Sequence, residues 1–163
     1  MINQVEFCRA MKRGEEAAVA ELLHLAFGGK AEAKLVDVLR KGGQMAGEMV
    51  MPARDGGLVG YYALSVMRQP KSWLCLAPVA VHPEWQGKGH GRRMIGQLSA
   101  WAVATRQYVV VLGQTDFYAR AGFDQARAAR LQSPYPIEHT LLAGPGQDQP
   151  DETLIYPAAF KAV

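Results

Sequence analysis

The apolar positions in the first quarter of the chain follow the period of amphipathic helices. From Gly14 to Phe27 they recur at helical spacing, and the glycines at 28 and 29 end the pattern. A second helix is predicted over Glu32–Lys41. Its predicted apolar face is formed by Leu35, Val38 and Leu39. Residues 2–11, ahead of both helices, mix β-branched and apolar side chains and predict a first strand.

The middle of the chain changes to short apolar runs that predict β-strands. Runs over residues 45–53 and 58–67 flank Asp55-Gly56-Gly57, which is a strong signal for a hairpin turn. A third strand is predicted over Trp73–His82, and the short connections favour an antiparallel meander. Pro78 interrupts this third strand. Because proline cannot donate to a sheet ladder, we expect a bulge or lost pairing there.

Helical spacing returns after a cluster of glycines near position 90, and the predicted helix ends at about Arg106. Its predicted buried stripe consists of Met94, Ile95, Leu98, Trp101, Ala102 and Thr105. The nearly all-apolar run Tyr108–Leu112 is typical of a strand that is buried on both faces. Because it follows a strand–helix unit, we expect it to lie parallel to the earlier strand through a right-handed crossover.

The last third of the chain is rich in proline and predicts short elements between loops. A short helix is expected over residues 116–121, ending at Gly122. Further strands are predicted over Phe123–Leu131, 138–143 and 152–156. No repeat, linker or shift in composition divides the chain. The sequence therefore predicts a single α+β domain over residues 1–163, built on one mixed sheet.

Composition and charge narrow the classes of partner. Of the 163 residues, 49% are apolar and 20% are charged, as in an ordinary globular protein. The net charge of +3 comes without a long basic run, so we expect no nucleic-acid partner. Neither a membrane-spanning run nor a secretory signal is visible, so we expect no membrane partner and a cytoplasmic location. Cys8 and Cys75, without clustered histidines, predict neither a disulfide framework nor a metal site.

The segment VAVHPEWQGKGHGRRMIGQL, residues 79–98, carries the clearest chemical signal. Gly87, Gly89 and Gly91 stand between a predicted strand and a predicted helix, where backbone N–H groups and the helix dipole favour a phosphate. Two known phosphate motifs fail on spacing. The dinucleotide fingerprint would need glycine at position 92 or 94, and the P-loop would need lysine and then serine or threonine after Gly96.

The pattern that fits is Gln86-x-x-Gly89-x-Gly91, which resembles the pyrophosphate-binding signature of the GNAT superfamily of N-acetyltransferases. LAPVAVHPEWQGKGHGRRM resembles that family's fourth strand, loop and following helix, and FYARAGF, residues 117–123, resembles the motif after its fifth strand. EAKLVDVLR and the closing IYPAAF resemble a bacterial subgroup, the YhbS-like GNATs. The resemblance covers nearly the whole chain. It implies a mixed, mostly antiparallel sheet of about six or seven strands with flanking helices.

The resemblance also implies a binding site for acetyl-CoA as cosubstrate, without a metal. In that family the fourth and fifth strands splay apart, and pantetheine pairs with backbone in the gap. Mapped onto this chain, Val79, Ala80 and Val81 would lie along pantetheine. The pyrophosphate would be held by Gln86, Gly87, Lys88, Gly89, His90, Gly91 and Arg92. The partners are then acetyl-CoA and an amine acceptor, and because members of the family often dimerise, a homodimer is a further expectation.

The implied reaction is direct transfer of the acetyl group to the amine of a small molecule or a peptide. Family practice assigns the hydrogen bond or proton for the departing CoA thiolate to a tyrosine, which is Tyr118 here. Where some lysine acetyltransferases of the superfamily carry a base glutamate, this chain has Cys75, which we interpret as a small buried hydrophobe. Glu48, His82 or a water chain are the alternatives for the base.

The sequence leaves the acceptor and two rival functions open. Many members carry an asparagine after the fifth strand, where this chain offers Gln114 and Asp116. Phe27, Tyr135 and Tyr156 suggest an apolar wall around the acceptor but no charged group. One rival function is an acyl-CoA-binding sensor or carrier of the same fold without efficient turnover. The other is a nucleotide-binding regulator whose loop holds other phosphates.

Overall fold

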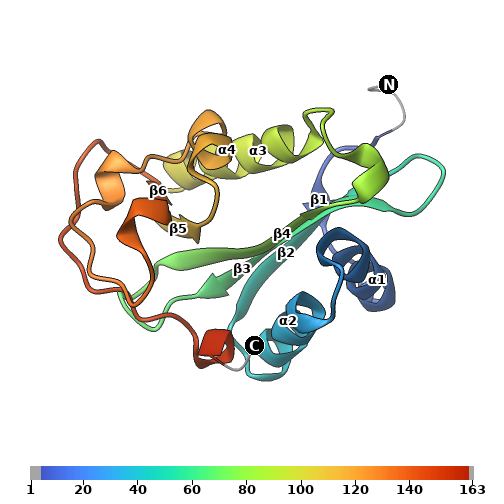
Figure 1. The fold of residues 1–163 in the computed structure, drawn as a ribbon, viewed down its shortest axis with the longest axis horizontal. Helices are drawn as coiled ribbons and strands as arrows, with labels where there is room; N and C mark the ends of the chain where they lie inside the picture. The colour runs from blue at the N-terminus through green and yellow to red at the C-terminus, as the bar shows by residue number, and fades with distance from the viewer. Residues whose placement is uncertain (1–4, 162–163) are drawn as a thin grey trace.

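The framework of the fold is one six-stranded sheet with its strands in the order β1-β2-β3-β4-β5-β6 (Figure 1). The computed structural model describes residues 5–161. The strands are β1 Arg9–Ala10, β2 Met45–Pro52, β3 Leu58–Val66, β4 Leu74–Val81, β5 Val109–Leu112 and β6 Thr140–Ala143. Neighbouring strands pair antiparallel except β4 and β5, which are parallel. The predicted α+β class, with a mixed and mostly antiparallel sheet, is confirmed.

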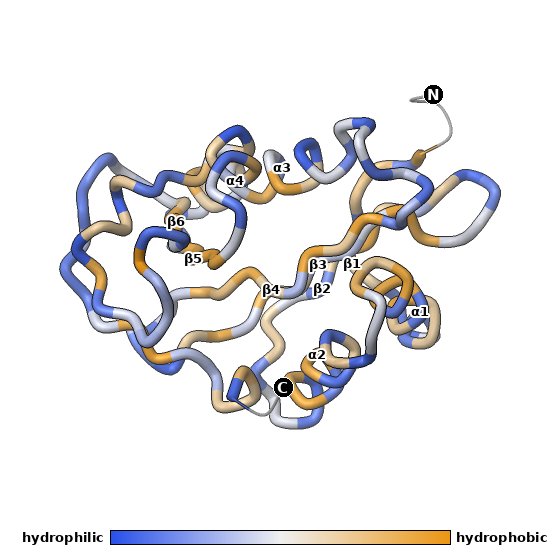
Figure 2. The backbone as a smooth tube through the Cα atoms, viewed as in Figure 1, coloured by the Kyte–Doolittle hydropathy of each residue, from blue (hydrophilic) through white to orange (hydrophobic). Residues whose placement is uncertain are grey.

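Helices cover both faces of this sheet. The helices are α1 Glu16–Phe27, α2 Ala31–Lys41, α3 His90–Ala104 and α4 Thr115–Arg120. α3 and α4 lie over one face, and α1 and α2 lie over the other, with apolar strand residues between them (Figures 1 and 2). The rest of that second face is covered by the C-terminal segment, through Leu131, Leu154 and Tyr156. Within residues 5–161, no helix is long and apolar enough to cross a membrane.

The elements with strong periodicity lie where the sequence predicts them. β2, β3 and β4 form the expected antiparallel meander, and Asp55-Gly56-Gly57 lies in the turn between the first two. α1 ends where Gly28 takes a left-handed conformation with a φ of 74°. β5 runs parallel to β4 after α3, so the predicted crossover between parallel strands is confirmed.

β4 carries a bulge at the position that Pro78 predicts. Tyr62 lies opposite Val79 and Leu64 lies opposite Leu76, so two residue steps on β3 face three steps on β4. On the other side, β4 pairs with β5 only over Leu74–Leu76. Beyond Leu76 the two strands separate, as the family resemblance implies. The predicted loss of regular pairing at Pro78 is confirmed.

Two predicted helix faces need correction. In α2, Val36 is fully buried beside Leu35 and Leu39, whereas Val38 is only partly buried. In α3, Trp101 is 43% exposed and Thr105 is exposed, so neither belongs to the buried stripe. Ser99 is buried instead, and its hydroxyl donates to the Ala121 carbonyl at 2.6 Å. The buried face of α3 is therefore turned toward the residues after α4 as well as toward the sheet.

The predicted first strand is largely wrong. Residues 2–4 lie outside the described residues. From residue 5 onward, Val5 forms one isolated bridge with Ala53, and regular pairing is limited to the two residues of β1. Opposite this segment, the Pro52 carbonyl of β2 accepts the Glu6 N–H at 2.8 Å. Because Pro52 has no N–H to donate in return, the pairing there lacks part of a regular ladder.

The strands predicted over Phe123–Leu131 and 152–156 are also wrong. Asp124 forms one bridge with Leu142, and its carboxylate then accepts the N–H of Arg127 at 3.2 Å. A side-chain acceptor of this kind competes with the sheet ladder and favours a turn, and a 3₁₀ turn follows over Ala126–Ala128. In the later segment, Thr153 and Ile155 form isolated bridges with two different parts of the chain, so no strand develops there.

Candidate functional site

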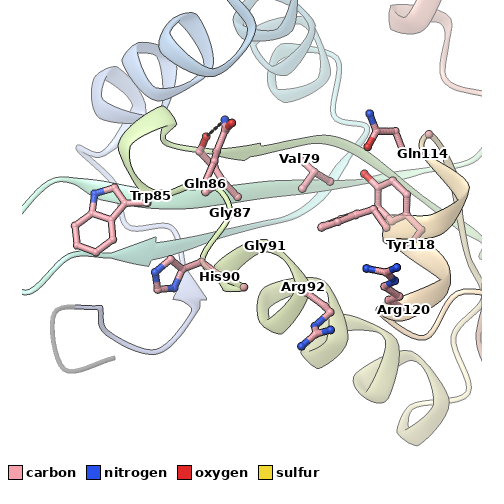
Figure 3. Close-up of a pocket in the computed structure, with 14 residues that line it drawn as sticks. Val79, Trp85, Gln86, Gly87, His90, Gly91, Arg92, Gln114, Tyr118 and Arg120 are labelled. Carbon is pink, nitrogen blue, oxygen red and sulfur yellow. Dashed lines mark hydrogen bonds between the residues drawn. The ribbon is translucent and has the colours of Figure 1, made fainter. Parts of the chain in front are cut away.

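The separation of β4 from β5 opens a cavity of about 840 Å³ against the glycine segment (Figure 3). The second half of β4, the start of α3, the end of β5 and α4 all contribute to its lining. Of the residues predicted to bind the cosubstrate, those that line it are Val79, Val81, Gln86, Gly87, Gly89, His90, Gly91 and Arg92. Ala80 and Lys88 do not line it. Sequence motifs therefore locate most of one wall of this cavity.

The alternation of the β4 backbone explains why Ala80 is missing from the lining. The His82 N–H donates to Val59 of β3, so the backbone groups of Ala80 also point toward β3. Those of Val79 and Val81 point the other way, toward the edge that β5 leaves unpaired. The Ala80 side chain is buried on the α1 face of the sheet. An extended ligand could therefore pair with Val79 and Val81 but not with Ala80.

The three glycines of the segment 87–91 serve different physical needs. Gly87 and Gly89 have φ values of 76° and 84°, in the left-handed region that favours glycine. Gly91 lies at the start of α3, where an added Cβ would lie 3.2 Å from Val81 and 3.3 Å from Phe117. Gly91 therefore lets the helix pack closely on β4 and α4. Each of the three glycines therefore has a physical cause within the chain itself.

Backbone N–H groups at the start of α3 are available to an anion. The first N–H groups of an α-helix have no acceptor within the helix. Among the described residues, those of His90, Gly91 and Arg92 donate to no other backbone group. They line the cavity at the positive end of the helix dipole. The segment can therefore bind a phosphate through its backbone, as its glycine pattern predicts.

The side chains of the glycine segment hold the loop in place. The Gln86 amide nitrogen donates to the Val81 carbonyl at 2.9 Å and so ties the loop to the end of β4 (Figure 3). The Lys88 ammonium lies 5.4 Å from the centre of the Trp85 ring, on which it stacks outside the cavity. His90 is buried against Trp85, and Arg93 lies 2.5 Å from its Nδ1. Burial, followed by the charge of Arg93, lowers the pKa of His90, so its ring is neutral at pH 7.

Two exposed arginines flank the same cavity. Arg92 projects from α3 and Arg120 from α4 (Figure 3). Arg120 was missed by sequence reasoning, as were Trp85 and Phe117 in the lining, whereas Gln114 was noted at its position after the fifth strand. Arg120 lies within the motif FYARAGF, but its side-chain direction depends on the packing of α4. The arginines and the helix start together make this cavity electropositive.

Tyr118 is held at the inner end of the cavity by close packing. An added Cβ at Gly113 would lie 2.6 Å from the Tyr118 ring, so the ring rests directly on the backbone there. Phe117 and Phe123 contact the ring edge-to-face, with centroids 4.9 Å and 5.9 Å away. Burial raises the pKa of Tyr118 to about 12, and the neighbouring Cys75 adds to the shift. The hydroxyl is therefore protonated at any ordinary pH and can act as a donor.

A second cavity, of about 370 Å³, adjoins the first on the α1–α2 face of the sheet. It is lined by the end of α1, the start of α2, the bulged part of β4 and the C-terminal segment. Val79 and Tyr118 line both cavities. Phe27, Tyr135 and Tyr156, which the sequence suggested as an apolar wall, all line this second cavity. The gap between β4 and β5 thus connects two sites on opposite faces of the sheet.

Neither side chain suggested as a base lines either cavity. The Glu48 carboxylate accepts hydrogen bonds from Arg40 and from the Tyr61 hydroxyl, each at 2.7 Å. Both oxygens of this carboxylate are therefore engaged in a hydrogen-bonded ion pair with Arg40, which Tyr61 joins. The Nδ1 atom of His82 accepts the Glu84 N–H at 3.1 Å, which caps the turn after β4. Within residues 5–161, no group of three potential ligands from His, Cys, Asp and Glu could hold a metal ion.

Comparisons with known proteins place these features in a family. Residues 47–125 match the family described as the acetyltransferase (GNAT) domain. The N-acetyltransferase YhbS of Escherichia coli K12 is 33% identical over 122 residues, which are 71% of this chain and 71% of that protein. The matched residues 47–125 include every residue named above in the first cavity.

Two crystal structures share the fold over nearly the whole chain. E. coli YhbS in complex with CoA has a TM-score of 0.81 and 24% identity, and the match covers 97% of this chain and 92% of that one. A GNAT family acetyltransferase from Brucella melitensis in complex with acetyl-CoA has a TM-score of 0.79 and 25% identity, and the match covers 97% and 99% of the two chains. The likeness thus extends to the N-terminal helices and the C-terminal segment.

The environment of Cys75 predicts an inert thiol. Cys75 is buried in β4, and burial raises its pKa to about 12. At pH 8 the thiolate fraction is then on the order of 10⁻⁴, and the thiolate is the reactive form. We expect Cys75 to resist iodoacetamide in the native protein at pH 8 and to react after unfolding in guanidinium. Peptide mass spectrometry measures both. Alkylation of native Cys75 as fast as that of a free cysteine peptide would contradict this expectation.

Proposed function

Because the chain belongs to the acetyltransferase (GNAT) family, we propose that it transfers the acetyl group of acetyl-CoA directly to the amine of a small molecule or a peptide. The observation that supports this most is the meeting of two cavities at Val79 and Tyr118. One cavity has the electropositive helix start that CoA phosphates require, and the other leaves room for an acceptor. The acetyltransferase domain then spans residues 1–163, since α1, α2 and the C-terminal segment all line the second cavity.

The first cavity would bind acetyl-CoA mainly through backbone. The N–H groups of His90, Gly91 and Arg92 face the pyrophosphate, and the side chains of Arg92 and Arg120 add charge near the phosphates. The Val79 backbone and the Val81 N–H pair with pantetheine along the unpaired edge of β4, whereas the Val81 carbonyl is already bonded to Gln86. Gln86, Lys88 and Trp85 support the loop rather than contact the ligand. With pantetheine bound along β4, the thioester would lie near Tyr118, at the junction of the cavities.

The transfer step would then need little movement. The neutral amine nitrogen attacks the thioester carbonyl carbon, so a C–N bond forms, and the C–S bond then breaks. A backbone N–H of β4 stabilises the oxyanion. The Tyr118 hydroxyl gives a proton to the departing sulfur. The proton that nitrogen loses passes to water, and Tyr118 regains a proton from water, so the enzyme returns to its starting state. Because Cys75 is buried and protonated, no acetyl-cysteine forms on the way.

The function itself is tested by release of CoA. The purified chain, with acetyl-CoA and a panel of amines and short peptides, should form free CoA and one acetylated amine in equal amounts. Liquid chromatography with mass detection measures both products. If acetyl-CoA binds tightly but no amine in the panel causes release of CoA, the result would instead support a sensor or carrier of the same fold.

Substitution at Gly89 tests the anion site. Both Gly89→Asp and Gly89→Asn introduce residues that tolerate a φ of 84°, so they differ chiefly in charge. At about 100 times its dissociation constant, acetyl-CoA should stabilise the wild type by about 2.7 kcal/mol. For a chain of this length that raises the melting temperature by roughly 5–10 °C. We expect the aspartate variant to lose most of this thermal shift and the asparagine variant to keep most of it. Equal shifts in the two variants would remove the segment from the phosphate site.

Tyr118→Phe tests the proposed proton donor. The edge-to-face ring contacts remain, so the thermal shift with acetyl-CoA should be unchanged. General acid catalysis is typically worth about 10²- to 10⁴-fold, so kcat should fall within or somewhat below that range, with little change in the KM for acetyl-CoA. Because the pKa of Tyr118 is raised to about 12, its ionisation should not shape the wild-type rate between pH 6 and 9. A kcat within twofold of wild type, with chemistry rate-limiting, would exclude this role.

A further inference from the structure

The second cavity combines an aromatic wall with a single charged group. Tyr156 contacts Tyr135 and Phe160 edge-to-face, with centroids 5.0 Å and 5.8 Å away, so the C-terminal segment supplies a continuous set of rings. Phe27 adds a further ring from the last residue of α1. Aromatic faces and edges of this kind favour flat apolar groups and also attract cations.

Among the described residues that line this cavity, Glu32 alone is an acidic or basic residue of the Asp, Glu, Lys, Arg or His type. It lies in the first turn of α2 and is partly buried. Among the described residues, it has no ion-pair or side-chain hydrogen-bond partner, in contrast to Glu48, which is engaged by Arg40 and Tyr61. Its carboxylate is therefore available to a ligand. No sequence pattern points to this role, because Glu32 resembles any acidic residue at a helix start.

The charge and size of this cavity limit the acceptor. No lysine or arginine lines it, so a carboxylate on the acceptor would have no partner and would be repelled by Glu32. A cavity of about 370 Å³ is at the small end of the range for small-molecule sites. A peptide segment would have to leave most of its length outside. A small, flat, apolar amine fits both limits.

We propose that the acceptor is an arylalkyl primary amine without a carboxylate, whose ammonium group is docked by Glu32 while its ring packs on the aromatic wall. This rests on the proposed function, because it identifies the second cavity as the acceptor site of the same reaction. Glu32 attracts the protonated amine, which is the abundant form at neutral pH. The amine then loses its proton to water before it reacts near Tyr118. Glu32 is a specificity-determining residue for the acceptor.

The test measures binding without turnover. With the chain saturated by CoA, isothermal titration calorimetry compares 2-phenylethylamine with 2-phenylethanol, which is neutral, and with phenylalanine, which carries a carboxylate. We expect the amine to bind at least about tenfold more tightly than either, as suits a hydrogen bond to a charged group. Glu32→Gln should reduce this preference to within about twofold of parity, because a neutral amide cannot favour the ammonium.

Two further variants separate charge from packing. Glu21→Gln, at an exposed position of α1 away from both cavities, removes the same charge and should leave all three affinities unchanged. Phe27→Ala alters a side chain that is 45% exposed, so the core stays intact. This substitution should weaken the binding of the amine and of the alcohol by the same factor, so the ratio of their dissociation constants should not change. All variants should retain the thermal shift with acetyl-CoA.

The results distinguish the two proposals. Equal binding of amine and alcohol, or a preference that survives in Glu32→Gln, would overturn the role of Glu32 whether or not the chain transfers acetyl groups. Tighter binding of phenylalanine than of 2-phenylethylamine would do the same. If the binding preference holds and depends on Glu32, but no amine releases CoA, then the proposed function fails while the cavity's selectivity for amines stands.

Discussion

The loss of pairing between β4 and β5 beyond Leu76 is the constraint on which the site depends. Backbone groups inside a sheet are normally all hydrogen-bonded, and leaving them without partners in a buried place is costly. Here the bulge at Ala77 and Pro78 turns β4 away from β5, while pairing with β3 continues to Val81. The open edge is therefore held by the rest of the sheet. It offers backbone partners to an extended ligand that carries amides of its own.

The same gap determines where the two substrates of the proposed reaction would lie. Because it passes through the sheet, cavities on the two faces can meet at Val79 and Tyr118 without any opening movement. Tyr118 is fixed there by contact with Gly113 and by two aromatic neighbours. A donor fixed at the point where two substrates meet contributes through orientation, which is among the larger sources of rate enhancement. Burial, which keeps its hydroxyl protonated, serves the same end.

Sequence reasoning succeeded where a local pattern determines the structure. Helical periodicity, the Asp55-Gly56-Gly57 turn and Pro78 gave the meander, the main helices and the bulge, because each depends on nearby residues. It failed where contacts between residues far apart in the sequence determine the burial of a side chain or the local conformation. The exposure of Trp101 and the burial of Ser99 depend on the position of the residues after α4, and the turn after Asp124 depends on a side-chain hydrogen bond. Motif matching found the glycine segment but could not find Arg120 or Glu32, whose roles depend on which side chains the tertiary fold brings together.

The two cavities also differ in charge, and this difference can sort the substrates. The first combines the positive end of the α3 dipole with Arg92 and Arg120, whereas the second, within residues 5–161, is lined by one acidic residue, Glu32, and by no lysine or arginine. Phosphates are therefore attracted to one face of the sheet and an ammonium group to the other. An amine that entered the first cavity would face like charges, as would CoA phosphates in the second. In the proposed reaction, opposite charge on the two sides of one gap therefore directs each substrate to its own cavity.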